Sequence, residues 1–252
     1  MNESTKPDQQ SVCDKIFQSA ETKQKGSKIL FLPRNVTPEN IDQICEVYSE
    51  VRENKFETVV VVEPYFGQLD KAIPLISDLQ FQTDYGPVSA NEQLRDDFCD
   101  EEDDFFIEDE GRHPGMGVYD HLGIVKCFKE DILGVSVQLA DERPAIVREL
   151  VYVLQEILAY RNALLVFCCD LNSEYTDEFE HINTLLEQQN TSNLMNYTFS
   201  GDSKIEGAGV FVAGVHVAHA WELEIVFFNE AYRHQRGTSL IAGSAGFAKE
   251  KV

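Results

Sequence analysis

The chain has 252 residues, of which 43% are hydrophobic, and a formal net charge of −23. A chain of this length can form one sizeable domain that buries roughly three quarters of its unfolded surface. The negative charge argues against nucleic acid and anionic membrane as partners, because both require clustered Lys and Arg. No apolar run reaches the roughly 18 residues of a membrane span, and the N-terminal segment lacks the layout of a signal peptide. We therefore expect an acidic cytoplasmic protein.

The first quarter of the chain predicts a tail, a strand, a helix and a second strand. Residues 1–26 are polar, and we expect a flexible tail with one turn of helix near 14–20. Residues 27–252 are expected to form a single domain. A strand is predicted at 28–33. A helix should follow from Thr37 to about Asn54, because Thr37-Pro38-Glu39 supplies an N-cap, a proline at the first helical position and an acidic residue in the first turn. The second strand is predicted at 57–62.

A dense acidic segment comes next. Ten of the fifteen residues from 96 to 110 are Asp or Glu. We expect an acidic, solvated loop at 95–112. A calcium site is not favoured, because the segment lacks the alternating ligands and central glycine of an EF-hand loop. Phe98 and the apolar residues 105–107 interrupt the charge, which leaves open that the loop is pinned to the body of the protein.

The second half alternates helices and strands. Helices are predicted at 120–128, from Arg143-Pro144 onward, at 174–189 and at 205–219; strands are predicted at 134–139, 163–168, 222–228 and 239–248. Three of the predicted strands, at 28–33, 57–62 and 163–168, are continuous apolar runs, which is typical of strands buried in a parallel sheet. The sequence therefore predicts the α/β class, as a three-layer sandwich with a mostly parallel sheet.

The six cysteines show no metal-binding pattern. They lie at 13, 45, 99, 127, 168 and 169, without a CxxC pair. We expect free, mostly buried thiols in a reducing compartment. The pair His216 and His219 could share a helix face as two metal ligands, or could be ordinary surface or core histidines near a helix end.

The carboxyl ends of the three buried strands are the predicted functional region, because ligands of open α/β sheets bind there. Those ends carry Arg34, the turn Glu63–Gly67, and Asp170 with Ser173, and none carries a histidine. Asp170 could be catalytic, or could be a turn-forming or helix-capping residue. Asp120 and His121 could act as an acid–base couple, or could be a partly buried polar pair packed against the acidic loop.

The order of these fragments resembles the Memo family, also called AmmeMemoRadiSam system protein B, whose fold is related to that of the LigB-type extradiol dioxygenases. The likeness covers residues 28–250. The family's Leu-Pro-His-Ala-Gly pattern reads Leu32-Pro33-Arg34-Asn35-Val36 here, and its Gly-Pro-Ser-His reads Glu63-Pro64-Tyr65-Phe66. Its Glu-His-Ser segment is similar to Asp120-His121-Leu122. Its Ser-Ser-Asp-Phe-x-His is similar to Cys168–Ser173, with the aspartate kept and the histidine replaced by Ser173.

Further elements of the family follow in the same order. Its Thr-Pro-Leu-Gly element is similar to Thr83-Asp84-Tyr85-Gly86, its later Cys-Gly to Ala208-Gly209, and its closing Val-Gly-Tyr-Ala to residues 245–248. The resemblance implies that the family supports a metal with two histidines and a cysteine. This chain carries Arg34, Phe66 and Ala208 at those positions. Since none of these side chains can bind a divalent cation, we expect a degenerate metal site with no metal or other cofactor.

Three functions remain open. We expect a Memo-like pseudoenzyme that serves as a non-catalytic binding or scaffolding protein, with its strand-end pocket filled by Phe66 and Tyr65. The alternative is a metal-independent enzyme that uses Asp170, His121 and Arg34 on an anionic small molecule, for which the pocket must be open and polar. A third is a structural subunit paired with an active paralogue. The partner is an unidentified protein or a small anionic ligand, and the oligomeric state is left open. The candidate pocket residues are Arg34, Tyr65, Phe66, Asp120, His121, Asp170, Ser173 and Ala208.

Overall fold

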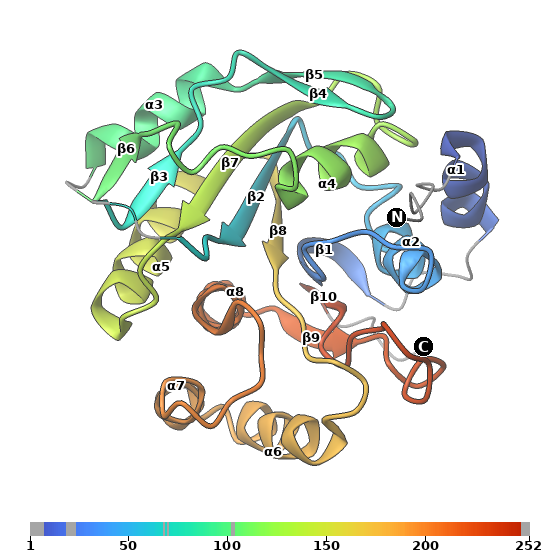
Figure 1. Cartoon of the computed structure of the whole chain (residues 1–252), viewed down its shortest axis with the longest axis vertical. Helices are drawn as coiled ribbons and strands as arrows, with labels where there is room; N and C mark the ends of the chain where they lie inside the picture. The colour runs from blue at the N-terminus through green and yellow to red at the C-terminus, as the bar shows by residue number, and fades with distance from the viewer. Residues whose placement is uncertain (1–7, 19–23, 68, 70, 102–103, 248–252) are drawn as a thin grey trace.

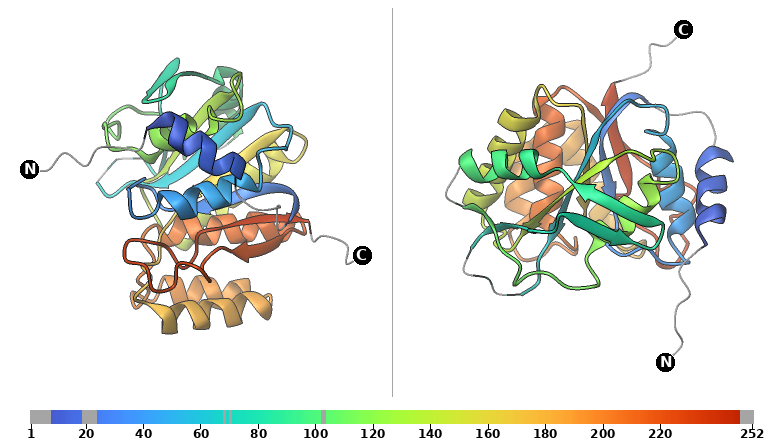
Figure 2. Two further views of the ribbon diagram at one scale, coloured as in Figure 1. Left: turned by 90° about the vertical axis from the view of Figure 1, so that its right-hand side faces the viewer. Right: turned by 90° about the horizontal axis from the view of Figure 1, so that it is seen from above.

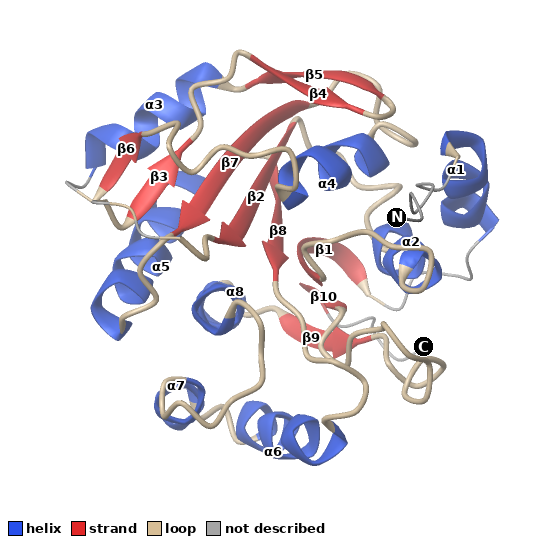
Figure 3. Ribbon diagram, viewed as in Figure 1, coloured by secondary structure: helices blue, strands red, loops and turns tan. Residues whose placement is uncertain are grey.

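The computed structural model describes residues 8–18, 24–67, 69, 71–101 and 104–247. These residues form a three-layer α/β sandwich, in which a twisted sheet lies between two layers of helices (Figures 1 and 2). Figure 3 shows the sheet strands in red, running through the middle of the molecule between the blue helices. The predicted fold class is confirmed.

The sheet has ten strands among the described residues, in the order β4-β5-β7-β2-β8-β1-β10-β9, with β3 paired to β7 and β6 paired to β3. The neighbours β7-β2-β8-β1 are parallel, whereas β4, β9 and β10 pair antiparallel at the two sides. The strands are β1 (Lys25–Leu32), β2 (Thr58–Pro64), β3 (Ile73–Leu75), β4 (Gln80–Thr83), β5 (Gly86–Ala90), β6 (Phe105–Ile107), β7 (Leu133–Leu139), β8 (Ala163–Cys168), β9 (Glu224–Phe227) and β10 (Gly243–Phe247).

Helices cover both faces of this sheet. The helices are α1 (Gln9–Gln18), α2 (Ile41–Ser49), α3 (Glu92–Glu101), α4 (Gly117–Val125), α5 (Pro144–Leu158), α6 (Thr176–Glu187), α7 (Thr191–Thr198) and α8 (Ala208–Ala220). Figure 2 shows α1, α2 and α4 on one side of the sheet, and α5 and α8 on the other. A hydrophobic core lies on each face of the sheet, and β2 contributes side chains to both. Val60 and Val62 belong to the core with α5 and α8, while Val59 and Val61 belong to the core with α2 and α4, because successive side chains point to opposite faces.

The strand ends converge at one edge of the sheet. In the parallel ladders, Leu32 of β1 pairs with Cys168 of β8, and Val62 of β2 pairs with Phe167 of β8. The residues that follow β1, β2 and β8 therefore emerge close together, as the sequence predicts.

The N-terminal segment differs from the predicted tail. Residues 9–18 form α1, which packs on α2 and buries Val12 and Ile16. These two residues are four apart and so lie on one helix face, a pattern that the polar composition hides. The expectation of a flexible tail through residue 26 is wrong for 9–18, and for 24–26, where β1 already begins at Lys25; residues 1–7 and 19–23 lie outside the described residues.

The acidic segment 95–112 is not a loop. It contains the end of α3 and the strand β6, and it buries Phe98 and Phe105, whose rings stack with centroids 6.0 Å apart. The apolar residues that interrupt the charge therefore anchor this segment in the core, so that a solvated loop is the wrong description.

The cysteines also differ from the expectation. Cys13 of α1 and Cys127, just after α4, form a disulfide, while the other four cysteines are free. The expected free thiols are thus wrong for this pair. Free Cys45, Cys168 and Cys169 are buried, as predicted.

The remaining elements match the predictions except at their ends. The helix after β1 begins at Ile41 rather than near Thr37, because residues 37–40 form a turn in which Asn40 Oδ1 accepts a hydrogen bond from Thr37 N at 2.8 Å. The β4–β5 hairpin, β3 and α7 were not predicted. Of the helices in the described part of the chain, none has the length and hydropathy needed to span a membrane.

Candidate functional site

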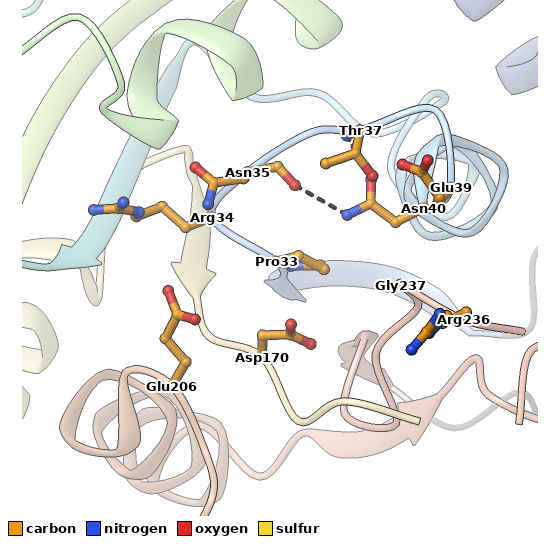
Figure 4. Close-up of a pocket in the computed structure, with 10 residues that line it drawn as sticks. All are labelled: Pro33, Arg34, Asn35, Thr37, Glu39, Asn40, Asp170, Glu206, Arg236 and Gly237. Atoms are coloured by element: carbon orange, nitrogen blue, oxygen red, sulfur yellow. Dashed lines mark hydrogen bonds between the residues drawn. The ribbon is translucent and has the colours of Figure 1, made fainter. Parts of the chain in front are cut away.

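An open groove of about 390 Å³ lies beside the carboxyl ends of β1 and β8. We call it the strand-end groove. Figure 4 shows Asp170 and Glu206 below the loop that follows β1, with Arg34 at one end of the view and Arg236 at the other. Its lining residues are Pro33, Arg34, Asn35, Thr37, Glu39, Asn40, Asp170, Glu206, Arg236 and Gly237.

Asp170 is held in the groove by the chain on both sides of it. Its backbone N donates to Glu206 O at 3.0 Å, and Glu206 N donates to Asp170 O at 2.8 Å. Burial raises the pKa of its carboxyl group, an effect that the Ser239 hydroxyl opposes and the charge of Glu206 reinforces. Oδ1 of Asp170 is buried and accepts no hydrogen bond. A buried carboxylate oxygen without a donor is a position that a ligand or water can satisfy.

Arg34 is the first residue after Pro33 at the end of β1. Its guanidinium carbon lies 5.1 Å from the centre of the Phe66 ring, a cation–π arrangement. The buried Nε has no hydrogen-bond partner, and the charge of the guanidinium acts on the buried carboxyl group of Glu63. The backbone of Arg34 packs closely on α4, since a Cβ on Gly117 would lie 2.7 Å from Arg34 O. A glycine at 117 thus allows α4 to approach the groove.

Glu63, next to last in β2, is not among the candidate pocket residues predicted from the sequence. It is fully buried, and its Oε2 accepts a hydrogen bond from Gly117 N at 2.8 Å, while Oε1 has no partner. Burial raises the pKa of Glu63 to about 7, although the Gly117 hydrogen bond and the charge of Arg34 oppose the rise. The sequence does place this carboxylate at the end of a buried strand. This strand-end position is the feature from which Glu63 could have been predicted as a site residue.

His121, a residue of α4, does not line the groove, and its side chain is buried in the core. It is fully buried; its Nε2 lies 3.0 Å from Pro33 O and its Nδ1 2.9 Å from the Tyr48 hydroxyl. Because a carbonyl oxygen only accepts, Nε2 carries the proton and Nδ1 accepts from Tyr48. Burial lowers the pKa of His121. Both ring nitrogens are thus engaged inside the core, which gives His121 a structural role.

The other predicted site residues are dispersed. Asp120 borders a different groove, together with Asp84 and Tyr119. Ser173 donates from its hydroxyl to Gln235 O at 2.9 Å, and so holds the loop before β10. The structure therefore brings Arg34 and Asp170 together at the groove but places Asp120, His121 and Ser173 elsewhere.

The two aromatic residues after β2 do not fill the groove. Phe66 is 62% exposed, and neither it nor Tyr65 lines the groove. The expected filled pocket is wrong, because the Phe66 ring stacks on the guanidinium of Arg34 instead of entering the space between the strand ends. Ala208 is buried at the start of α8, next to Gly207, which has a φ of 72°. A Cβ on Gly207 would meet Cys168 O at 2.9 Å, so glycine is needed where α8 meets the end of β8.

The carboxyl group of Glu142, a residue just before α5, lies at the first turn of α8. Its carboxyl group accepts a hydrogen bond from Gly209 N, which opposes the rise in its pKa caused by burial. This helix end therefore already has an anionic partner from within the chain.

The residues present do not fit the metal that the family resemblance implies. Within the described ranges, no three His, Cys, Asp or Glu side chains gather closely enough to hold a metal ion. By the sequence resemblance, Arg34, Phe66 and Ala208 would stand at the three ligand positions, and a guanidinium repels a divalent cation.

Comparison with known proteins supports the fold alone. The structure is similar to the crystal structure of the uncharacterized protein JW3007 from Escherichia coli K12, with a TM-score of 0.52 and 14% sequence identity. The match covers 86% of this chain and 97% of that chain. No family model matches the sequence, and no curated protein matches it.

Proposed function

We propose that this chain is a Memo-like protein with a degenerate metal site, and that it binds a small molecule in the strand-end groove without catalysing a reaction. The observation that carries the proposal is the groove itself. It is open, lies close to the ends of β1 and β8 and is lined by several polar and charged residues, and the buried Nε of its Arg34 has no hydrogen-bond partner. A cavity of about 390 Å³ falls within the size range of small-molecule sites.

Small-molecule binding is favoured over protein scaffolding. A scaffold without a ligand has no need for an open polar cavity with unpartnered charged groups. Desolvated polar atoms without partners cost about 1–3 kcal/mol each, a cost that a bound ligand relieves. Arg34 Nε and Asp170 Oδ1 are two such atoms at this groove.

The geometry weighs against the alternative of a metal-independent enzyme. That alternative used His121 as part of the chemistry, but both ring nitrogens are engaged inside the core. The titratable neighbour of Asp170 in the described part of the chain is Glu206, a second carboxyl group, and not the histidine that this alternative uses. Nucleic acid is not proposed as a partner, because the net charge of −23 opposes it.

The cytoplasm is the location that we propose. Four of the six cysteines are free, and three of those are buried, which is common in proteins of reducing compartments. The bond between Cys13 and Cys127 is the feature that opposes this placement. Alkylation of thiols before cell lysis, followed by mass spectrometry, tests it: a Cys13–Cys127 pair that is fully oxidised in cells would contradict a reducing location.

Elemental analysis of the purified full-length chain tests the proposed function. We expect no stoichiometric iron, copper or zinc, because the groove offers a guanidinium where the resembled family has a metal ligand. About one metal ion per chain would overturn the proposal. To exclude metal held elsewhere, the same analysis is run on the double variant His216→Ala, His219→Ala.

A further inference from the structure

The strand-end groove is lined by charges of both signs, which come from three carboxylates, including Glu39, and two guanidinium groups. Asp170 and Glu206 lie on one wall, and Arg34 and Arg236 lie toward the two ends of the view in Figure 4. Two buried atoms of these side chains, Arg34 Nε and Asp170 Oδ1, have no hydrogen-bond partner, although opposite charges in one groove usually pair when geometry allows. Their backbones keep them apart: Asp170 and Glu206 are bridged to each other, and Arg34 is turned toward Phe66.

Neither a simple anion nor a simple cation satisfies this arrangement. An anion on Arg34 would share the groove with the carboxyl groups of Asp170 and Glu206, in a protein whose net charge is −23. A cation on Asp170 would leave Arg34 unpaired. A molecule that carries both an ammonium and a carboxylate group satisfies both, since each charge-assisted hydrogen bond is about twice as strong as a neutral one.

We infer that the strand-end groove binds a small amino carboxylate, with the ligand's ammonium group on Asp170 and its carboxylate group on Arg34. This inference rests on the proposed small-molecule function and specifies its ligand class. Asp170 Oδ1 is a buried acceptor without a donor, and Arg34 Nε is a buried donor without an acceptor. Glu206 lies beside Asp170 and adds negative charge around the ammonium group.

The test uses calorimetric titration of the full-length protein with a series of unbranched amino carboxylates, from glycine to 6-aminohexanoate. Butyrate, butylamine and inorganic phosphate are the probes with one kind of charge. We expect one member of the series to bind with a Kd of about 1 mM or tighter, and at least about tenfold more tightly than any probe with one kind of charge. The chain length of the tightest-binding member gives the separation between ammonium and carboxylate groups that the groove accepts.

Substitutions of Asp170 and Arg34 test which residue binds each charged group of the ligand. Asp170→Asn and Arg34→Gln are each expected to weaken binding of the best member about tenfold or more, because each removes one charge-assisted contact. The matched controls are Asp131→Asn and Arg148→Gln, both on the exposed surface outside the groove, which should bind as the unaltered protein does. If Asp170→Asn does not fold, Glu206→Gln provides the second acidic variant, with a smaller loss expected.

Three results would overturn the inference. Equal affinity for butyrate or phosphate would show a simple anion site, and equal affinity for butylamine would show a simple cation site. Absence of binding by the whole series would show that the groove does not take this class of ligand. Each of these is distinct from failure of the proposed function, which the metal content of the same preparation reports independently.

Discussion

Two polar regions at the carboxyl ends of the same strands are built in opposite ways. Around His121, each polar atom of the ring is paired: Tyr48 donates to it and Pro33 O accepts from it. At the other region, Arg34, Glu63 and Asp170 each keep a buried atom without a partner. The comparison teaches that a titratable residue beside the strand ends is not by itself functional. A ligand site differs from structural packing in that some of its buried polar atoms have no hydrogen-bond partner within the protein.

Removing the His121 ring should give the largest loss of stability. His121→Ala leaves a cavity and deprives both the Tyr48 hydroxyl and Pro33 O of a partner. We expect the free energy of unfolding to fall by about 3 kcal/mol, measured by urea denaturation. His234→Ala, on the exposed surface, is the matched control and should change it by less than about 0.5 kcal/mol. An equally small effect at His121 would mean that its hydrogen bonds do not hold the core together.

Glu63 should affect stability in a pH-dependent manner. Its pKa is raised from 4.5 to about 7 in the folded state, so the folded chain keeps a proton that the unfolded chain has lost. The contribution of Glu63 to the free energy of unfolding is therefore fully present below pH 4.5 and is lost as pH rises through about 7. Glu63→Gln removes this dependence. Relative to the unaltered protein, the variant should gain about 3 kcal/mol of unfolding free energy between pH 4.5 and 7.

The control for this pH series is Glu57→Gln, because Glu57 is exposed at the other end of β2. The difference in unfolding free energy between this control variant and the unaltered protein should not change with pH over the same range. If Glu63→Gln also gave a flat difference, Glu63 would be ionised in the folded state, and Arg34 would be close enough to hold that charge.

Arg34 should matter least for stability. Its guanidinium contacts an exposed ring and no carboxylate among the described residues, and an exposed cation–π contact contributes about 0.5–1 kcal/mol. Arg34→Gln should therefore lower the free energy of unfolding by no more than about 1 kcal/mol in urea denaturation at pH 7. A loss as large as that of His121→Ala would show that Arg34 is a structural anchor and not a free ligand contact.

The sequence predicts the sheet well, because long apolar runs such as 58–62 and 163–168 have few alternatives to a buried parallel strand. It also places Arg34 and Asp170 together, since the ends of adjacent parallel strands meet. It does not reveal that His121 turns into the core, because that depends on Tyr48 from another helix. Nor does it reveal Glu206, which reaches Asp170 through a backbone bridge across 36 residues of chain.

The acidic segment shows why local composition misleads. Its charged residues dominate the count, but two aromatic residues, Phe98 and Phe105, determine where the segment lies. Burial of one large aromatic side chain outweighs the solvation preference of several exposed carboxylates, which remain in water on the outer side.

Calorimetric titration with a divalent cation tests the central claim most directly. The unaltered protein is compared with Phe66→His and with the triple variant Arg34→His, Phe66→His, Ala208→Cys. We predict no binding by the unaltered protein or the single variant, because one imidazole beside a guanidinium does not make a metal site. The triple variant should bind measurably, since it supplies three donors and removes the repelling charge. Tight, stoichiometric binding by the unaltered protein would contradict the account.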